Sequence, residues 1–315
     1  QKNQFQKNHY IKLKILYHIY IYIYISNKFL NNKFDITKTK SIDLPDQIDI
    51  FTYSFPCQDL SVQGKQKGME KNSNTRSGLL WEVERILKET YNSNKNNLPK
   101  YLVLENVKNI ISQKHNIAYE QWLNELKKLG YISKTYKLNS INFNSPQSRE
   151  RVFCISVRED IMKQNNFKFP ELENIKQKNK KILKDILDIE YDKKLNLDYL
   201  LKYQLSNPII SSSNIKKSTL KGYTNFNSES YVYYEDYSGP TLTASGANSR
   251  IKIYTSDKKL RKMSAKECYR YMGFSDEDYE NVAKTKLLNE TKIIYTAGNS
   301  IVVSVLEEIF KSFKF

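Results

Sequence analysis

The stretch Ile48-Asp49-Ile50-Phe51-Thr52-Tyr53-Ser54-Phe55-Pro56-Cys57 joins an apolar run to a proline and a cysteine. Ile, Phe and Tyr dominate residues 48–53, which predicts a buried β-strand. Pro56 fixes its own φ and biases its predecessor toward extended geometry, so we expect the strand to end in a stiff turn. Open α/β sheets bind ligands beyond the carboxyl ends of their strands. Cys57 is therefore a candidate nucleophile.

The alternative interpretation is that Cys57 is structural. A single cysteine after a strand usually packs as a small hydrophobe, whereas a catalytic thiol needs an accessible, electropositive setting. Cys57, Cys154 and Cys268 lie far apart and form no CxxC pattern or His/Cys cluster. Neither a metal site nor a disulfide framework is predicted, which fits a reducing cytoplasm.

Helical and strand patterns alternate in the part of the chain that follows Cys57. Residues 77–91 and 119–129 carry apolar side chains at helical spacing. Strand patterns occupy residues 101–104, 131–138 and 151–157. Strands that alternate with helices predict an α/β protein with a doubly wound sheet.

The composition changes near residue 160. Residues 163–194 are rich in Lys and Asn, and residues 205–257 are polar with many Ser and Tyr. Few core signals occur there until a helical pattern returns at 264–272. We therefore predict a catalytic α/β domain over 35–162, a smaller loop-rich domain over 163–280 and a C-terminal helix over 281–315 that returns to the catalytic domain.

The first 34 residues differ from the rest. Residues 19–25 alternate strictly between Ile and Tyr, which is low complexity. A TA-repeat tract read as codons encodes this alternation, so we expect a repeat tract or a frame-shifted segment; an edge strand is the alternative. The apolar stretch 18–25 is shorter than a membrane span, and no signal-peptide cleavage pattern follows it. No membrane association is predicted.

The charge balance favours a polyanionic partner. The chain has 51 Lys and Arg against 34 Asp and Glu, a net charge of +17. Phosphate contacts by Lys and Arg release counterions and drive nucleic-acid binding. Nucleotide bias toward Lys, Asn, Ile and Tyr codons is the alternative explanation.

Three further segments at predicted element boundaries carry side chains suited to chemistry. They are Glu105-Asn106-Val107, Gln147-Ser148-Arg149-Glu150-Arg151 and Gly298-Asn299-Ser300, the last of which we expect to open the final helix. Because strand ends in a parallel sheet meet at one edge, these segments and Cys57 are expected to share a site. Each alone has an ordinary explanation: a turn opener, a solvated charge run and a helix cap.

These residue types make a coherent catalytic set. A thiol is an effective nucleophile only when ionised, and Arg149 and Arg151 could lower its pKa and hold an anion. Glu105 could act as an acid or as the hydrogen-bond partner of a ring nitrogen.

The histidines argue against a Cys–His hydrolase, the commonest alternative for a cysteine enzyme. Such a hydrolase needs a histidine beside the thiol. His9 and His18 lie within the first 34 residues, and we expect His115 to lie in a polar loop.

In this order, the four segments resemble the ordered motifs of cytosine-5 DNA methyltransferases. Phe34-Asp35-Ile36-Thr37 is similar to the family segment whose acidic residue contacts the adenine of S-adenosylmethionine. Pro240-Thr241-Leu242-Thr243 resembles the Thr-Leu element of the recognition region. Residues 261–274 resemble the motif that follows this region. The resemblance spans residue 35 to the carboxyl end.

The resemblance implies a Rossmann-like, S-adenosylmethionine-dependent methyltransferase sheet with a smaller target-recognition domain. Cys57 would attack C6 of a cytosine and make C5 nucleophilic. Glu105 would contact N3 and the exocyclic amine, Asn106 would shape that end, and Arg151 and Arg149 would orient the ring. The implied catalytic residues are Cys57, Glu105, Arg149, Arg151, Pro56 and Asn106.

The resemblance also implies two sets of binding residues. S-adenosylmethionine would be the cofactor, and duplex DNA, with its target cytosine flipped out, would be the substrate. The loop 61–76 would close over the flipped base, and 167–263 would read the sequence. The implied cofactor-binding residues are Asp35, Asn299 and Ser300. The implied DNA-binding residues are Gln58, Ser61, Gln63, Lys65, Thr241 and Leu242.

One family feature is absent from this sequence. The family begins with a glycine-rich strand and loop that hold the cofactor, but the first glycine here is Gly64. We therefore expect either a fragment of a longer reading frame or a degenerate copy. An inactive DNA-binding remnant remains an alternative, as does an RNA cytosine-5 methyltransferase. The expected setting is a cytoplasmic monomer, with a cognate restriction endonuclease as a candidate partner.

Overall fold

The computed structural model of the protein describes residues 35–57, 59–60, 68–71, 75–175 and 180–313. These residues form two compact units. The four-stranded unit holds the described residues of Lys33–Asn139, Glu150–Ile175 and Glu308–Phe315. The five-stranded unit holds those of Ser140–Arg149 and Lys176–Glu307.

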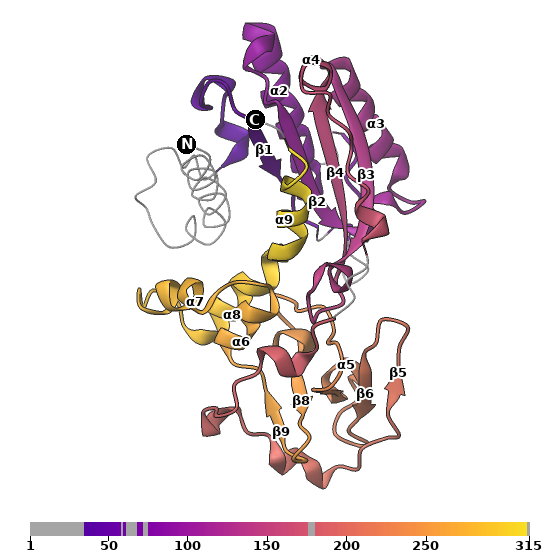
Figure 1. Ribbon diagram of the computed structural model, residues 1–315, viewed down its shortest axis with the longest axis vertical. Helices are drawn as coiled ribbons and strands as arrows, with labels where there is room; N and C mark the ends of the chain where they lie inside the picture. The colour runs from indigo at the N-terminus through magenta and orange to yellow at the C-terminus, as the bar shows by residue number, and fades with distance from the viewer. Residues whose placement is uncertain (1–34, 58, 61–67, 72–74, 176–179, 314–315) are drawn as a thin grey trace. The chain divides into compact units, whose positions relative to one another are not determined.

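The sheet of the four-stranded unit has the order β1-β2-β4-β3 (Figure 1). Its strands are β1 (Ile50–Tyr53), β2 (Tyr101–Val107), β3 (Tyr131–Asn139) and β4 (Glu150–Arg158). The predicted α/β class is confirmed, with β1 and β2 parallel. However, β4 runs antiparallel to both β2 and β3. The beginning of β4, and not its end, therefore meets the carboxyl end of β2.

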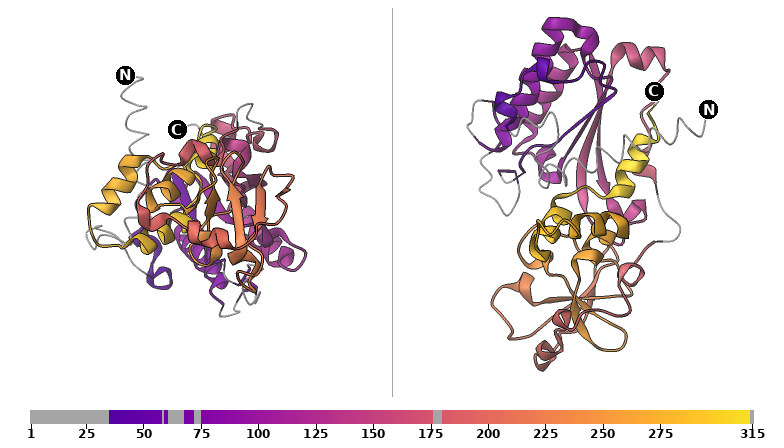
Figure 2. Two further views of the ribbon diagram at one scale, coloured as in Figure 1. Left: turned by 90° about the horizontal axis from the view of Figure 1, so that it is seen from below. Right: turned by 90° about the vertical axis from the view of Figure 1, so that its left-hand side faces the viewer.

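Two helices cover a face of this sheet, as Figures 1 and 2 show. The short 3₁₀ turn η3 (Ser77–Leu79) leads into α2 (Leu80–Asn94), and α3 (Asn116–Lys128) follows β2. These bounds agree with the predicted helices at 77–91 and 119–129 apart from a few terminal residues. The face of α2 that points toward the sheet is buried because its apolar residues recur at helical spacing.

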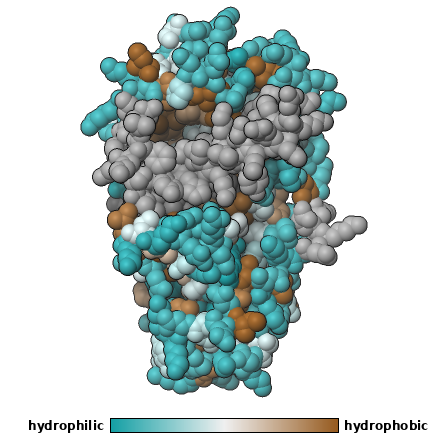
Figure 3. Space-filling view, turned by 60° about the vertical axis from the view of Figure 1, so that its left-hand side comes forward, coloured by the Kyte–Doolittle hydropathy of each residue, from teal (hydrophilic) through white to brown (hydrophobic). Residues whose placement is uncertain are grey.

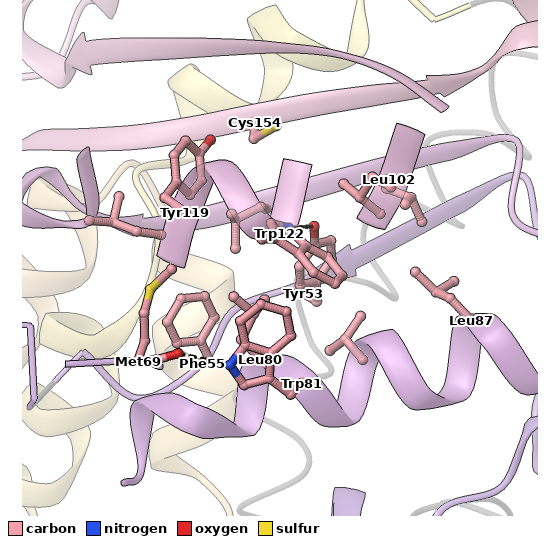
Figure 4. Packing of buried hydrophobic residues seen from close by; sticks show 14 of the residues in the cluster. Tyr53, Phe55, Met69, Leu80, Trp81, Leu87, Leu102, Tyr119, Trp122 and Cys154 are labelled. Carbon is pink, nitrogen blue, oxygen red and sulfur yellow. Dashed lines mark hydrogen bonds between the residues drawn. The ribbon is translucent and has the colours of Figure 1, made fainter. Parts of the chain in front are cut away.

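The core lies between these helices and the sheet (Figure 4). Trp122 of α3 is fully buried, and its indole nitrogen donates to the Tyr53 hydroxyl at 3.1 Å. Trp81 of α2 meets Trp122 edge-on, with ring centroids 6.2 Å apart. Burying each large aromatic side chain contributes about 1.5–3 kcal/mol. This core fixes β1 and α2, the two elements on either side of Cys57 in the chain.

The chain returns to the four-stranded unit at its carboxyl end. The ring of Phe313 stacks on that of Tyr101, with centroids 4.5 Å apart and planes 8° apart. Phe167, after α4 (Glu159–Gln164), contacts both rings. This aromatic cluster holds the last described residue of the chain beside the start of β2.

The five-stranded unit contains a second sheet of order β5-β6-β7-β8-β9. Its strands are short, and only β7 and β8 pair in parallel. Long irregular segments connect them, as the polar composition predicts. The strands are β5 (Ile209–Ile210), β6 (Lys216–Thr219), β7 (Tyr231–Tyr234), β8 (Lys252–Tyr254) and β9 (Leu260–Lys262). The helices are α5 (Asn227–Ser230), α6 (Ala265–Tyr271), α7 (Asp276–Ala283) and α8 (Glu290–Asn299).

The prediction that Gly298-Asn299-Ser300 opens the final helix is wrong. Gly298 and Asn299 are the last residues of α8, and α9 (Val303–Phe310) starts after a break. Asn289 caps α8 at its start, and the Ser300 hydroxyl donates to Ala297 O at 2.7 Å at its end. The run Glu290–Phe310 is apolar and long enough to cross a membrane, but half of its most apolar window is buried, and such a run is typical of core helices too.

His115 is buried, contrary to the prediction of a polar loop. It precedes α3 and is 1% exposed, and neither ring nitrogen has a hydrogen-bond partner among the described residues. Burial lowers its pKa below 6.5; Lys114 adds to this effect and Glu70 opposes it. His115 is therefore neutral in the folded protein near pH 7.

We expect His115 to make folding less favourable in acid. Unfolded chains protonate histidine near pH 6.5, but the buried ring resists protonation, so its stabilising contribution is present above about pH 6.5 and is lost as the pH falls. Urea unfolding of the wild type and His115→Phe at pH 7.5 and 5.5 tests this expectation. The pH-dependent loss of unfolding free energy should be smaller in the variant; an equal loss would contradict it.

Candidate functional site

Cys57 follows β1 at the carboxyl edge of the four-stranded sheet. Pro56 precedes it, and its thiol is partly exposed and free of any disulfide. The side-chain amide of Asn106, near the end of β2, donates to Phe55 O at 3.0 Å. The end of β2 thus holds the chain just before the cysteine.

Glu105 and Arg151 form an ion pair beside this turn. Arg151 Nε lies 3.2 Å from Glu105 Oε1, and their side chains are only 19% and 13% exposed. In the antiparallel register, Glu105 faces Phe153 and Val107 faces Arg151, so Glu105 and Arg151 are diagonal neighbours on one face of the sheet. The Ser54 hydroxyl reaches Glu105 at 3.5 Å. Three of the four predicted segments therefore meet at this edge.

The other two cysteines cannot easily replace Cys57. Cys154 and Cys268 are 0% and 1% exposed, and burial raises the pKa of each thiol. A buried thiol with a raised pKa is a poor nucleophile at neutral pH. Only Cys57 combines a partly accessible thiol with a charged neighbourhood.

Arg149 lies in the five-stranded unit, although it is only two residues from Arg151. Its buried guanidinium donates to Leu242 O at 2.7 Å, Gly298 O at 3.1 Å and Ser300 O at 3.0 Å. These contacts hold a loop against the end of α8. They indicate a framework role for Arg149, whereas its predicted contact with the substrate ring stays a prediction.

Gln147 ties the same loop to α6. Its amide oxygen accepts from Leu242 N at 2.9 Å, and its amide nitrogen donates to Tyr271 O at 3.3 Å. Gly239 forms a parallel bridge with Gln147, and the Tyr271 hydroxyl donates to Pro240 O at 2.7 Å. The 147–149 and 240–243 segments, distant in sequence, therefore form one hydrogen-bonded assembly.

Gly298 completes this assembly. A Cβ atom at this position would overlap the main chain of Thr243 and Ala244, so only glycine allows the loop to pack directly on α8. Close packing at the end of a helix thus explains Gly298 of the 298–300 motif.

Thr241 and Leu242, predicted to contact DNA, are also held in this assembly. The Thr241 hydroxyl donates to Ser148 O at 2.8 Å, and the Leu242 side chain is 0% exposed. Leu242 could reach DNA only if the loop opened. The other residues with this predicted role, Gln58, Ser61, Gln63 and Lys65, lie outside the described residues.

The predicted cofactor-binding residues lie in different units. Asn299 is exposed on the last turn of α8, and Ser300 is buried beside it in the five-stranded unit. Asp35 belongs to the four-stranded unit, where Thr37 N and Oγ1 donate to its Oδ1 at 3.0 and 2.7 Å. The Thr37 hydrogen bonds lower the Asp35 pKa, so this carboxylate is ionised at neutral pH.

The chemistry of Asp35 fits the adenine end of S-adenosylmethionine. Its second oxygen, Oδ2, lies 3.8 Å from Lys38 Nζ, beyond hydrogen-bond distance. This oxygen can accept a hydrogen bond from an exocyclic amine. The described residues contain no group of three His, Cys, Asp or Glu suited to hold a metal ion.

Lysine side chains of β6 pair with tyrosine rings of β7 in the second sheet. Lys217 of β6 lies 3.7 Å from the ring centroid of Tyr231, and Lys216 lies 4.7 Å from that of Tyr234. Cations held by aromatic rings suit a phosphate backbone. On the face drawn in Figure 3, hydrophobic residues are scattered among hydrophilic ones, as is usual for protein surfaces.

Two residues that hold the cysteine turn were missed in the sequence. Ser77 donates to Pro56 O at 2.5 Å, and Asn109 donates to Leu60 O at 2.5 Å. Ser77 stands at the start of a helical pattern, where serine reads as an ordinary cap. For Asn109, the sequence contains one signal of a role in this turn: it lies three residues after Asn106, which directly follows Glu105.

Known proteins share the sequence and fold of this chain. The profile of the family described as C-5 cytosine-specific DNA methylase matches residues 9–314. The orphan methyltransferase M.SssI of Spiroplasma monobiae is 46% identical over 298 residues, which cover 95% of this chain and 72% of that protein. The type II methyltransferase M2.ScrFI of Lactococcus lactis subsp. cremoris is 33% identical over 299 residues, 92% of this chain and 72% of that one.

Solved structures show the same fold. The Dnmt2 methyltransferase of S. pombe superimposes with a TM-score of 0.58 and 22% sequence identity. The match covers 89% of this chain and 84% of that structure. At this identity the likeness concerns the fold alone.

Proposed function

Because the chain belongs to the C-5 cytosine-specific DNA methylase family, we propose that it methylates C5 of a flipped-out cytosine in a specific duplex sequence through a covalent Cys57–C6 bond. Membership makes it a DNA cytosine methyltransferase that uses S-adenosylmethionine. The observation that carries the finer proposal is the meeting of a partly exposed Cys57 with the Glu105–Arg151 pair at one sheet edge. Pro56 and Asn106 hold the turn.

The first step uses Cys57 as the nucleophile. Its thiolate attacks C6, the C5–C6 double bond opens, and the electron pair moves toward N3 and O2 of the ring. Glu105, in its protonated form, donates its proton to N3, which neutralises the new charge on the ring; the carboxylate that remains is stabilised by Arg151. The ring is then an enamine, and its electron pair can return to C5.

The second step methylates C5 and then breaks the bond between the Cys57 sulfur and C6. S-adenosylmethionine, when bound, supplies an electrophilic methyl group, and Asp35, Asn299 and Ser300 are the residues proposed to border it. After methylation a base takes the C5 proton, the C5–C6 double bond re-forms, and Cys57 leaves as a thiolate. Arg151 holds the Glu105 carboxylate throughout, and we propose that it also orients the ring.

The five-stranded unit is proposed to read the DNA. Flipping a base out of a duplex costs a few kcal/mol, so the surrounding contacts must offset this cost. The net charge of +17 and the lysine–tyrosine pairs of β6 and β7 supply phosphate contacts. Gln58, Ser61, Gln63, Lys65 and the Thr241–Leu242 loop are further proposed contacts.

A methyl-transfer assay tests this proposal. The protein is mixed with tritiated S-adenosylmethionine and, in parallel reactions, unmethylated duplex DNA or RNA, and each digested product is searched for labelled 5-methylcytosine. Label in 5-methylcytosine of duplex DNA is expected. DNA binding without label would indicate the inactive remnant, and label only in RNA would indicate an RNA methyltransferase.

We expect Glu105→Gln to slow this reaction about 10²-fold or more, because the amide cannot supply the proton that N3 needs. The affinity for duplex DNA should change little, since Glu105 acts on the flipped base. Glu150→Gln is the matched control: Glu150 is next to Arg151 but forms an exposed pair with Lys108. Equal rates for Glu105→Gln and the control would remove Glu105 from the mechanism.

The names of two relatives support a proposal for the setting of the enzyme. One is called a type II methyltransferase and another an orphan methyltransferase. A cognate restriction endonuclease is therefore one proposed partner, to be sought by its cleavage of the unmethylated target sequence. We further propose that the enzyme works as a monomer in the cytoplasm, where it meets its DNA.

A further inference from the structure

Ser77 holds the chain on both sides of Cys57. Its hydroxyl donates to Pro56 O at 2.5 Å, and its backbone N–H donates to Asp59 Oδ2 at 3.3 Å. The Pro56 carbonyl belongs to the peptide bond between Pro56 and Cys57. Asp59 lies two residues after Cys57. Ser77 thus holds the chain immediately before Cys57 and two residues after it.

The anchor itself is rigid. Ser77 is 0% exposed and begins η3, which continues into α2. Leu80 and Leu87 of α2 are fully buried in the core of the unit. The Trp81 indole also donates to Met69 O at 2.8 Å, in a buried setting. Ser77 therefore ties the cysteine turn to a helix that is packed into the core of the four-stranded unit.

Asn109 holds the same turn from the β2 side. Its amide donates to Leu60 O at 2.5 Å, and Leu60 N donates to Cys57 O at 3.0 Å. Leu60 is fully buried. The carbonyls of Pro56, Cys57 and Leu60 are therefore all engaged, two of them by side chains from separate elements.

We propose that Ser77 is a positioning residue for the nucleophile: its hydroxyl sets the orientation of the Pro56–Cys57 peptide and so aims the Cys57 sulfur at C6 of the target cytosine. This inference rests on the proposed function of Cys57. The attacking atom must lie about 3–3.5 Å from its target, and a misplacement of about 1 Å can cost 10²-fold in rate. Ser77 touches neither substrate nor cofactor in this role, but acts through the peptide.

The test distinguishes the orientation of the Cys57 thiol toward the cytosine from the intrinsic reactivity of that thiol. Ser77→Ala should form the covalent adduct with 5-fluorocytosine duplex DNA, in the presence of S-adenosylmethionine, about 10–10²-fold more slowly than wild type. The affinity for DNA should be unchanged. Iodoacetamide should alkylate Cys57 at least as fast as in wild type, because a small reagent needs no aiming. Cys154 and Cys268 are buried and will not obscure this measurement.

Two variants control for simple loss of a buried hydroxyl. Ser112 lies in the same unit, and its buried hydroxyl has no hydrogen-bond partner among the described residues. Ser112→Ala should therefore leave adduct formation unchanged. Ser77→Thr keeps the donor and should recover part of the rate. If Ser77→Ala does not fold, Asn109→Ala tests the opposite side of the turn, with the same expected pattern.

Each outcome decides the matter. A wild-type adduct rate in Ser77→Ala would overturn the proposal, as would a slower rate explained by weaker DNA binding or matched by Ser112→Ala. If the wild-type protein forms no adduct at all, the proposed function fails instead. Cys57 alkylation in that protein still shows whether the thiol is accessible.

Discussion

Cys57→Ser should abolish methyl transfer to DNA, with a loss of at least about 10⁴-fold. Removing the nucleophile of a covalent mechanism costs about 10⁴–10⁶-fold in comparable enzymes, because the remaining site can only bind and orient the substrate. Serine is nearly isosteric, but its hydroxyl is far less ionised than a thiol. The measurement is tritium transfer from S-adenosylmethionine to duplex DNA under single-turnover conditions.

Binding and folding should survive this substitution. The Cys57 side chain is not part of the hydrophobic core, so the melting temperature and DNA affinity of Cys57→Ser should stay close to wild type. Cys154→Ala provides the matched control, since it removes a sulfur from the same unit without touching the sheet edge. Label transfer that persists in Cys57→Ser, or vanishes equally in Cys154→Ala, would show that another group attacks the ring.

Glu267→Ala should destabilise the five-stranded unit by about 3–5 kcal/mol, the usual cost of leaving one partner of a buried ion pair alone. Glu267 and Arg261 are 0% and 1% exposed and form a bidentate pair, with one contact at 3.0 Å. Glu267 also accepts from Ser264 N at 2.7 Å, closing a capping box at the start of α6, and from Asp188 N at 2.8 Å. Arg261 also lies 4.2 Å from the Tyr191 ring centroid, and its burial means that the lost carboxylate is not simply replaced by bulk water.

Chemical denaturation monitored by circular dichroism measures this loss. Glu280→Gln is the control, because Glu280 forms only an exposed pair with Lys266 at 3.6 Å and should change the unfolding free energy by less than about 0.5 kcal/mol. A loss below about 1 kcal/mol for Glu267→Ala would mean that the buried Arg261 finds a new partner. Such a result would contradict the expected contribution of this pair to stability.

The sequence predicts the elements around the catalytic edge well. Periodicity places β1, α2 and α3 within a few residues, because each buries a regular apolar face. The structure places Cys57, Glu105 and Arg151 at strand ends or starts, as the sequence predicts, whereas their catalytic roles stay predictions. Hydrophobic periodicity and short motifs are sufficient to predict these elements and positions, because each depends on a few residues that are close in sequence.

The direction of β4 could also have been predicted. Apolar alternation does not encode strand direction, and residues 131–138 and 151–157 read alike. However, a parallel connection needs a crossover of a dozen or more residues, usually helical. The predicted strands leave only the twelve residues 139–150 between them, with a proline and no helical pattern, and this favours the antiparallel pair that the structure contains.

Other features depend on tertiary contacts that no local pattern reports. His115 sits among polar neighbours in the sequence yet is buried, because the fold and not the local composition decides its exposure. Arg149 lies two residues from Arg151, but its partners are three carbonyls from distant segments. A break in an apolar run, as between α8 and α9, is equally invisible when both halves are apolar.

The split of the chain at residues 140–149 limits how this enzyme can be rebuilt. These ten residues leave the four-stranded unit after β3 and supply Gln147 and Arg149 to the five-stranded unit before β4 begins. A gene segment that begins after β4 therefore encodes the five-stranded unit without Gln147 and Arg149, whose hydrogen bonds hold it together. Residues 180–250 could be replaced by the corresponding segment of another enzyme in order to change the DNA specificity. This exchange would place a different loop against Gln147 and Gly298. A successful graft should keep the native 239–244 and replace only the strands and turns outside it.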